Sequence, residues 1–142
     1  MLKEELTKQQ LGKRGRQSGK KFELKVRKDL EDDGWIVSKW NNTIDFENNK
    51  LIQAKSKYNP FTKRVMSEGS GFPDFVAYKL VNELFVVIGV ESKKAKYLDK
   101  EEKKMIEWLR EHRIFANIFV AYPKKEEGKR NINVEYYVPA GV

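Results

Sequence analysis

A nearly unbroken apolar run at residues 84–90 is the feature that most constrains the fold of this chain. An apolar run of this length, bounded by charged residues, is typical of a central strand that is buried on both faces of a sheet. The segment at residues 72–81 also has strand character, and its proline stands at the start, where a strand tolerates one. We therefore predict two neighbouring strands, joined as a hairpin through residues 79–83.

The other expected elements surround this pair of strands. Apolar residues recur at helical spacing between Gly19 and Gly34, which predicts a helix with Gly34 at its C-terminal end. Asp99 is typical of an N-cap and predicts a second helix. Further strands are predicted at residues 35–40, 114–122 and 133–138. This order predicts an α/β fold with a central mixed β-sheet flanked by helices.

Two polar segments interrupt the pattern. Residues 1–18 are basic and contain several glycines, so we expect a flexible basic N-terminal arm. Residues 19–142 are expected to form a single domain, with an insertion at about 41–71. Within the insertion, residues 50–58 are expected to form an edge strand or a hairpin arm.

The charge balance indicates an anionic partner. The chain has 29 Lys and Arg residues against 21 Asp and Glu residues, a formal net charge of +8. Such an excess attracts polyanions, and DNA is the leading candidate. The candidate nucleic-acid contacts are Arg14, Arg16, Lys20, Lys21, Lys55, Lys57, Lys63 and Arg64. The alternative is an inert, solubilising set of charges.

The cysteine count and the N-terminal residues bear on location. The chain has no cysteine, so disulfides and thiolate metal sites are excluded. The first ten residues are polar and do not resemble a signal peptide, and no apolar run approaches the length of a membrane span. We expect a cytoplasmic protein with no membrane association.

The two predicted strands carry acids and a lysine where apolar or small residues are usual. Glu91 and Lys93 are two residues apart at the end of one strand, so both side chains point to one face. In the predicted hairpin, Asp74 arrives opposite Glu91. Two converging carboxylates repel each other unless a hard cation such as Mg²⁺ lies between them. This arrangement suits phosphodiester hydrolysis, with Lys93 neutralising the charge of the transition state.

Glu23 is a further candidate, because it lies at the edge of the buried stripe of the first helix and can face the same metal. Plainer interpretations exist for each residue taken singly. Asp74 follows Pro73 and can be a turn residue. Glu91 and Lys93 can be an exposed salt-bridged pair.

Two strings resemble motifs of a known superfamily. GSGFPDF at residues 69–75 and VIGVESKK at residues 87–94 are similar to the PD and ExK motifs of the PD-(D/E)XK nucleases. The resemblance covers residues 19–122 and implies a restriction-endonuclease-like core of helix, three strands, helix and strand. It implies that Asp74, Glu91 and the backbone carbonyl of Ser92 ligate Mg²⁺, with Mn²⁺ as a substitute. It also implies that Lys93 is catalytic and that Glu23 assists.

Two branches of the superfamily are similar to this chain. The string KRGRQSGKKFE at residues 13–23 resembles the start of archaeal Holliday-junction resolvases, and GFPDF followed by ExK resembles the virus-type replication-repair nuclease domain. The expected activity is that of a Mg²⁺-dependent endodeoxyribonuclease acting on branched or structured DNA, as a homodimer that cuts two strands. The segment before Asp74 is longer than the compact resolvase pattern.

Alternatives remain open for the site and for the function. Asp45, Gln53 and Lys55 mimic the D and QxK pattern of another branch of the superfamily. His112, the only histidine, is interpreted as a packing residue at a helix end. In place of a nuclease, the chain can be a catalytically inactive nucleic-acid-binding module with the same fold, or a basic structural protein.

Overall fold

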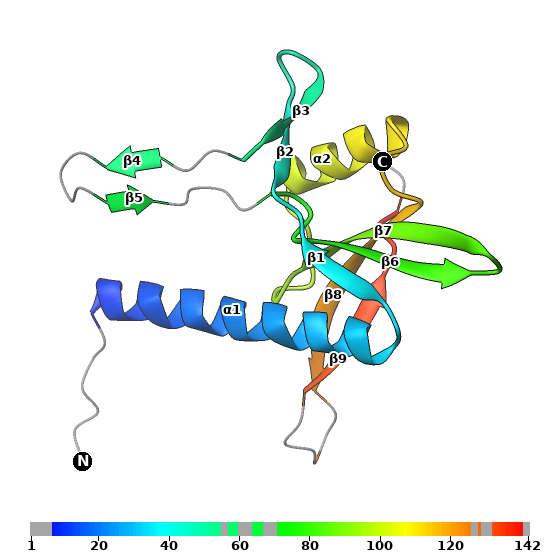
Figure 1. Ribbon diagram of the computed structural model, residues 1–142. Helices are drawn as coiled ribbons and strands as arrows, with labels where there is room; N and C mark the ends of the chain where they lie inside the picture. The colour runs from blue at the N-terminus through cyan, green and yellow to red at the C-terminus, as the bar shows by residue number, and fades with distance from the viewer. Residues whose placement is uncertain are drawn as a thin grey trace.

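A five-stranded mixed sheet forms the centre of the computed structural model (Figure 1). The structure describes residues 7–54, 57–59, 64–66, 71–125, 128 and 132–140, with the backbone alone for residues 11, 12, 14, 16, 57–59 and 64–66. The strands lie across the sheet in the order β1 (Ile36–Lys39), β6 (Phe75–Val81), β7 (Leu84–Ser92), β8 (Asn117–Lys125) and β9 (Ile132–Tyr137). β7 and β8 are parallel, and the other neighbours are antiparallel.

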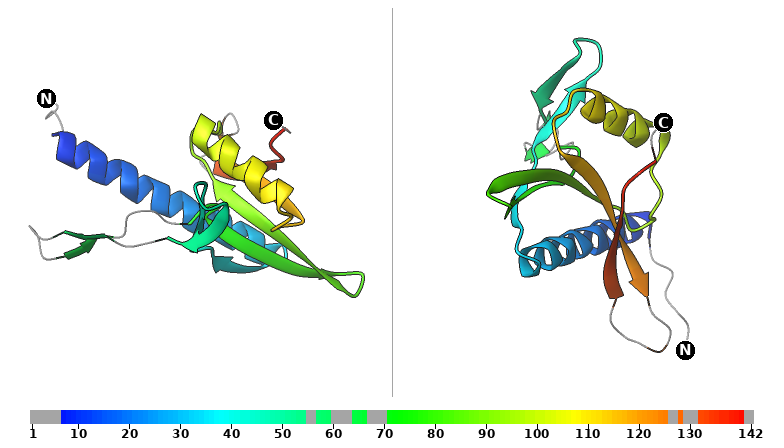
Figure 2. Two further views of the ribbon diagram at one scale, coloured as in Figure 1. Left: turned by 90° about the horizontal axis from the view of Figure 1, so that it is seen from above. Right: turned by 90° about the vertical axis from the view of Figure 1, so that its right-hand side faces the viewer.

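Within the described part of the chain, two helices cover opposite faces of this sheet (Figure 2). Helix α1 (Lys8–Asp32) buries Phe22, Val26 and Leu30 against one face, and α2 (Lys100–Glu111) packs against the other through Ile106 and Leu109. The predicted α/β class with a mixed central sheet is confirmed. Neither helix is both long and apolar enough to cross a membrane.

Helix α1 begins well before the predicted Gly19. Thr7 is its N-cap, and the side chains of Thr7 and Gln10 each accept a hydrogen bond from the other's backbone N–H. A cap of this kind contributes about 1 kcal/mol, which offsets the roughly 0.5–1 kcal/mol that one glycine costs inside a helix; α1 contains Gly12, Gly15 and Gly19. The prediction of a flexible arm is therefore wrong for residues 8–18, and residues 1–6 lie outside the described residues.

The predicted hairpin is present as β6 and β7. Asn82 and Glu83 both have positive φ, at 50° and 69°, as a two-residue turn of this type requires. The prediction that residues 84–90 are buried on both faces is wrong for the outer half of the strand, because Leu84 and Phe85 are exposed. The reason is that β8 pairs with β7 only from Ile88 onward. The outer half of the hairpin therefore projects beyond the sheet and its helices (Figure 1).

The insertion between β1 and β6 contains two further hairpins. β2 (Asn42–Asp45) pairs with β3 (Lys50–Gln53), and β4 (Lys57–Asn59) pairs with β5 (Arg64–Met66). The expected single element at residues 50–58 is thus two strands in separate hairpins. Ile44 of β2 is buried in the core beneath α2, so the first hairpin is part of the domain.

Gly71, which leads into β6, gives a test of the packing that positions this strand. A Cβ at Gly71 would lie 2.3 Å from the carbonyl oxygen of Trp40 and 2.6 Å from the backbone nitrogen of Asn42. Backbone atoms cannot yield as a flexible side chain does, so we expect Gly71→Ala to lower the free energy of unfolding by about 3 kcal/mol or more, as measured by urea denaturation.

The matched control is Gly15→Ala in α1. A Cβ at Gly15 would meet nothing within 4 Å, and alanine favours the helix, so this substitution should raise the free energy of unfolding by roughly 0.5–1 kcal/mol. Equal effects of the two substitutions would contradict both the close approach at Gly71 and the helical state of residue 15.

Candidate active site

Asp74 and Glu91 meet where β6 begins and β7 ends. The register pairs Phe75 with Val90, so the next pair outward is Asp74 and Glu91. Glu91 is only 6% exposed, although it is a charged residue type. The structure therefore brings together the two acids that the sequence singled out, on the face of the sheet that α2 covers.

The close packing of Pro73 and Gly89 positions this acid pair. A Cβ at Gly89 would lie 2.8 Å from Cγ of Pro73 and 3.1 Å from Cδ2 of Phe115. The absent side chain at residue 89 thus lets Pro73 pack directly onto β7, one position before Asp74. The hydrophobic core therefore begins directly next to the two carboxyl groups.

Asp74 is also held by Ser92. One carboxylate oxygen of Asp74, Oδ2, accepts hydrogen bonds from the backbone N–H of Ser92 at 2.9 Å and from its hydroxyl at 2.7 Å. Charge-assisted bonds of this kind fix the orientation of a carboxylate. The family resemblance implies a role for the carbonyl group of Ser92, whereas the contacts in the structure are donated by its N–H and its hydroxyl.

The environment of Glu91 disfavours a negative charge. Burial raises the pKa of Glu91 well above its ordinary value, and the hydrogen bond and the charge of Asp74 raise it further, as does the charge of Glu102. Two adjacent carboxyl groups in a poorly solvated place are stable only if they share a proton or if a cation compensates them. The site is therefore prepared to accept positive charge.

Lys93 extends from the end of β7 to α2. Its Nζ lies 2.9 Å from Oε1 of Glu102, and about a quarter of the Lys93 side chain is exposed. Partial burial alone would lower the pKa of Lys93, but the hydrogen bond and charge of Glu102, together with the charge of Glu91, raise it above its ordinary value. Lys93 is thus held as a cation beside the acid pair.

Glu102 is a functional candidate that the sequence interpretation missed. It is the third residue of α2 and is 9% exposed, and its Oε1 also accepts a hydrogen bond from the backbone N–H of its N-cap, Asp99, at 3.0 Å. The available signal was the capping box formed by Asp99 and Glu102. What the local pattern did not reveal is that the same carboxylate binds Lys93.

Glu23 approaches the pair from the opposite layer. It is half-buried on α1, and its pKa is raised by burial and by the charge of Asp74, while Lys39 and Lys20 oppose that shift. Among the described residues, however, no three His, Cys, Asp or Glu side chains are arranged so that they could hold a metal ion. The acids therefore approach one another pairwise, Glu23 with Asp74 and Asp74 with Glu91, and the expected three-acid cluster is not formed.

The pair of Asp74 and Glu91 nevertheless fits a hard divalent cation. Mg²⁺ prefers oxygen ligands, retains several waters, and is usually held by one or two carboxylates together with phosphate oxygens of a substrate. Two carboxylates, one of them buried and destabilised in its charged form, supply such a donor set. An ion held by this pair could also bind an oxygen of a phosphate ester.

The candidate nucleic-acid contacts fall on two segments. Lys20 and Lys21 are exposed on α1, whose backbone also carries Arg14 and Arg16. Of the other four, Lys57 lies in β4 and Arg64 lies in β5, the two strands of the second hairpin of the insertion, and Lys55 and Lys63 lie outside the described residues. The first turns of α1 and the β4–β5 hairpin project on one side of the sheet, opposite the tip of the β6–β7 hairpin (Figures 1 and 2).

The structure does not assemble the alternative site. Asp45 pairs with Lys50 beside the turn of the β2–β3 hairpin, whereas Gln53 pairs with Asn42 at the other end, about 10 Å along the strands. Asp45 instead accepts two hydrogen bonds from Asn48 within the turn, and Lys55 lies outside the described residues. Asp45 and Gln53 are thus parts of a hairpin and do not converge.

His112 has the packing role expected of it. Its ring stacks on that of Trp108, with centroids 3.8 Å apart, at the C-terminal end of α2.

The raised pKa of Glu91 predicts a stability effect with a definite sign. Because the folded protein holds this proton more tightly than the unfolded chain does, stability falls as pH rises above the ordinary glutamate value of 4.5. Glu91→Gln removes the buried charge, so without metal it should raise the melting temperature at about pH 8 by roughly 3 °C, the shift that about 1 kcal/mol gives in a chain of this length. The gain should shrink toward about pH 4.5.

Glu107→Gln, which changes an exposed glutamate of α2, is the matched control and should leave the melting temperature unchanged. A destabilised Glu91→Gln at the higher pH would contradict the electrostatic description of the pair.

Comparisons with known proteins do not assign the chain. No family model, no curated protein and no solved structure matches it. The functional inference therefore depends on the residues and contacts described above.

Proposed function

We propose that this protein is a Mg²⁺-dependent deoxyribonuclease of the PD-(D/E)XK superfamily, with Asp74, Glu91 and Lys93 at its active centre. The observation that carries the proposal is the contact between the buried Glu91 and Asp74, with Lys93 held as a cation beside them. The element order supports it as well. Setting the insertion aside, α1, β1, β6, β7, α2 and β8 follow the sequence of helix, three strands, helix and strand of the restriction-endonuclease-like core.

Each residue has a separable role in this proposal. Asp74 and Glu91 would hold Mg²⁺, and the chemistry that the ion supplies when bound is charge neutralisation at the phosphate and a lowered pKa of water. Lys93 stabilises the negative charge that develops on the phosphate during attack. Ser92 orients Asp74 through its two hydrogen bonds, and Glu23 adds negative charge that interacts with Asp74.

The distribution of basic residues supports DNA as the substrate. The basic segments of α1 and of the β4–β5 hairpin project on the side of the sheet where β6 begins and β7 ends, away from the hairpin tip (Figure 1). A polyanion bound between such segments would release counterions and pass the acid pair. Branched or otherwise structured DNA is the proposed substrate, since two projecting segments suit a bulky, non-linear duplex.

The central test is cleavage of plasmid, linear duplex, single-stranded and four-way-junction DNA, with Mg²⁺, with Mn²⁺ or with chelator. We expect cleavage only with the metals. Glu91→Gln and Lys93→Ala should each lower the rate by about 10²–10³-fold, because each removes a group that acts on the reacting phosphate.

Glu107→Gln and Lys28→Ala, at exposed positions on α2 and α1, are the matched controls and should cut at the wild-type rate. Salt-sensitive binding without any cleavage would favour a catalytically inactive binding module instead. Cleavage that survives both active-centre substitutions would overturn the assignment.

The contact between Glu102 and Lys93 predicts a change in the pH–rate profile. Glu102→Gln can keep the capping box, in which glutamine substitutes for glutamate, but it removes the charge that raises the pKa of Lys93. We expect the alkaline limb of the profile to move to lower pH, because Lys93 then loses its proton earlier, and kcat to fall by roughly tenfold or more. Glu101→Gln, an exposed neighbour, is the control. An unshifted alkaline limb would show that Glu102 only caps the helix.

A further inference from the structure

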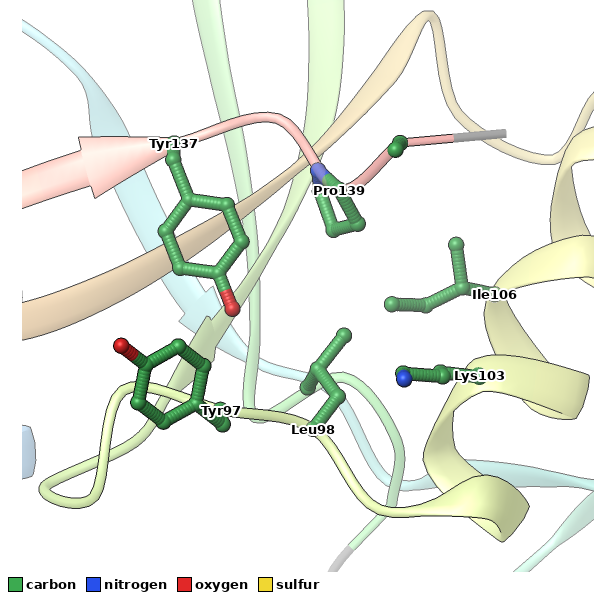
Figure 3. Close-up of a pocket in the computed structure, with 7 residues that line it drawn as sticks. Tyr97, Leu98, Lys103, Ile106, Tyr137 and Pro139 are labelled. Carbon is green, nitrogen blue, oxygen red and sulfur yellow. The ribbon is translucent and has the colours of Figure 1, made fainter. Parts of the chain in front are cut away.

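A cavity of about 340 Å³ lies between the loop that precedes α2, α2 itself and the end of β9. Its lining combines two tyrosines, apolar side chains and one lysine: Tyr97, Leu98, Lys103, Ile106, Tyr137, Pro139 and Ala140. Figure 3 shows the rings of Tyr97 and Tyr137 on one side of the space, Ile106 and Lys103 on the other, and Leu98 between them. We call this space the tyrosine cavity.

The walls of the tyrosine cavity are fixed by hydrogen bonds. The hydroxyl of Tyr137 donates to the carbonyl oxygen of Lys96, which has a left-handed backbone conformation with φ 69°. On the other wall, the guanidinium of Arg110 donates to the carbonyl oxygens of Pro139 and Ala140 and so ties the segment after β9 to α2. The walls of the cavity are thus held in place by the protein's own hydrogen bonds, as in preformed binding sites.

The cavity suits a flat aromatic ligand that carries negative charge. Tyr97 is 74% exposed, so its ring is accessible to a ligand that enters the cavity. The ammonium of Lys96 lies 4.9 Å from the ring centroid of Tyr122 and 5.7 Å from that of Tyr97, and Lys103 stands at the edge. Exposed tyrosine faces with adjacent cations are the means by which proteins stack unpaired bases and contact their phosphates.

The tyrosine cavity adjoins the candidate active site. Lys103 follows Glu102 in sequence, and Ile106 lies one helical turn further along α2, on the same face as Glu102. Burial raises the pKa of Tyr137, the charge of Glu102 raises it further, and the charge of Lys93 opposes that shift, so the phenol interacts with both members of this ion pair. The cavity thus begins beside the first turn of α2, which carries Glu102.

We infer that the tyrosine cavity binds one unstacked base of a nucleic acid strand, next to the phosphodiester that lies at Glu91 and Lys93. The inference rests on the proposed nuclease function for the position of the phosphate, and it adds to that function a preference for strands with unpaired bases. The base stacks on Tyr97. Lys103 and Lys96 contact the flanking phosphates, and Leu98 and Ile106 form the apolar floor of the cavity.

The test measures binding in chelator, so that no cleavage takes place. Single-stranded DNA and RNA oligonucleotides, either intact or lacking the base at one position in turn, are titrated by fluorescence anisotropy. We expect one abasic position to weaken wild-type binding about tenfold, as loss of a stacked base does. Tyr97→Leu should bind about tenfold more weakly and be insensitive to the abasic position, whereas Tyr97→Phe, which keeps the ring, should behave like the wild type.

Phe85→Leu, which removes an exposed ring at the tip of the β6–β7 hairpin, is the matched control and should leave binding unchanged. Because Tyr97 is exposed, Tyr97→Leu should leave the melting temperature unchanged, and this measurement shows that the variant is folded. Equal affinities of Tyr97→Leu and the wild type would overturn the base site, even if the wild type cuts DNA. If binding depends on the base but no metal-dependent cleavage is found, the base site stands and the proposed nuclease function is overturned. If neither DNA nor RNA binds, the base site and the nuclease function are both overturned.

Discussion

The antiparallel register of β6 and β7 is the constraint on which the candidate active site depends. The two-residue turn at Asn82 and Glu83 pairs Val81 with Leu84, and every later pair follows from that one as far as Phe75 and Val90. A slip of one residue would turn each side chain of one strand to the other face of the sheet. Asp74 and Glu91 would then lie on opposite faces, and neither a shared proton nor a shared cation could join them.

The acid pair lowers the stability of the folded protein, and the proposed function gives a reason for it. Burying Glu91 beside Asp74 disfavours the folded protein at neutral pH. The surrounding contacts restrain each group in one orientation: Ser92 holds Asp74, and Glu102 holds Lys93. Restraint of this kind is expected where charged groups must already stand in position before a phosphate arrives.

Local signals in the sequence explain which parts of the fold could be predicted. The strand character of residues 72–81 and 84–90 and the turn between them predicted the hairpin, and through it the meeting of Asp74 with Glu91. The start of α1 differs from the prediction because two local signals conflict. The glycines of residues 8–18 favour a flexible segment, whereas the capping box of Thr7 and Gln10 starts a helix.

Other features depend on contacts between distant parts of the chain. Leu84 and Phe85 are exposed because β8 begins pairing only at Ile88, and no pattern within β7 carries that information. In the sequence, Glu102 has only the pattern of a helix-capping residue. Its ion pair with Lys93 forms because the loop before α2 brings the start of this helix back to the end of β7. The tyrosine cavity likewise forms between residues that are far apart in the sequence, Tyr97 and Tyr137.

The position of the site at the end of the strands reconciles a dry core with charged chemistry. Next to the acids, Pro73 and Phe115 both pack closely on Gly89, so the hydrophobic core begins one residue away from Asp74. Above them, both helical layers contribute charged groups, Glu23 from α1 and Glu102 from α2. A side chain in the middle of the sheet points to one face and is therefore in contact with one helical layer only. At the end of the sheet, charged side chains from both layers, Glu23 and Glu102, influence the acid pair. In the proposed nuclease, the DNA backbone would pass there without entering the core.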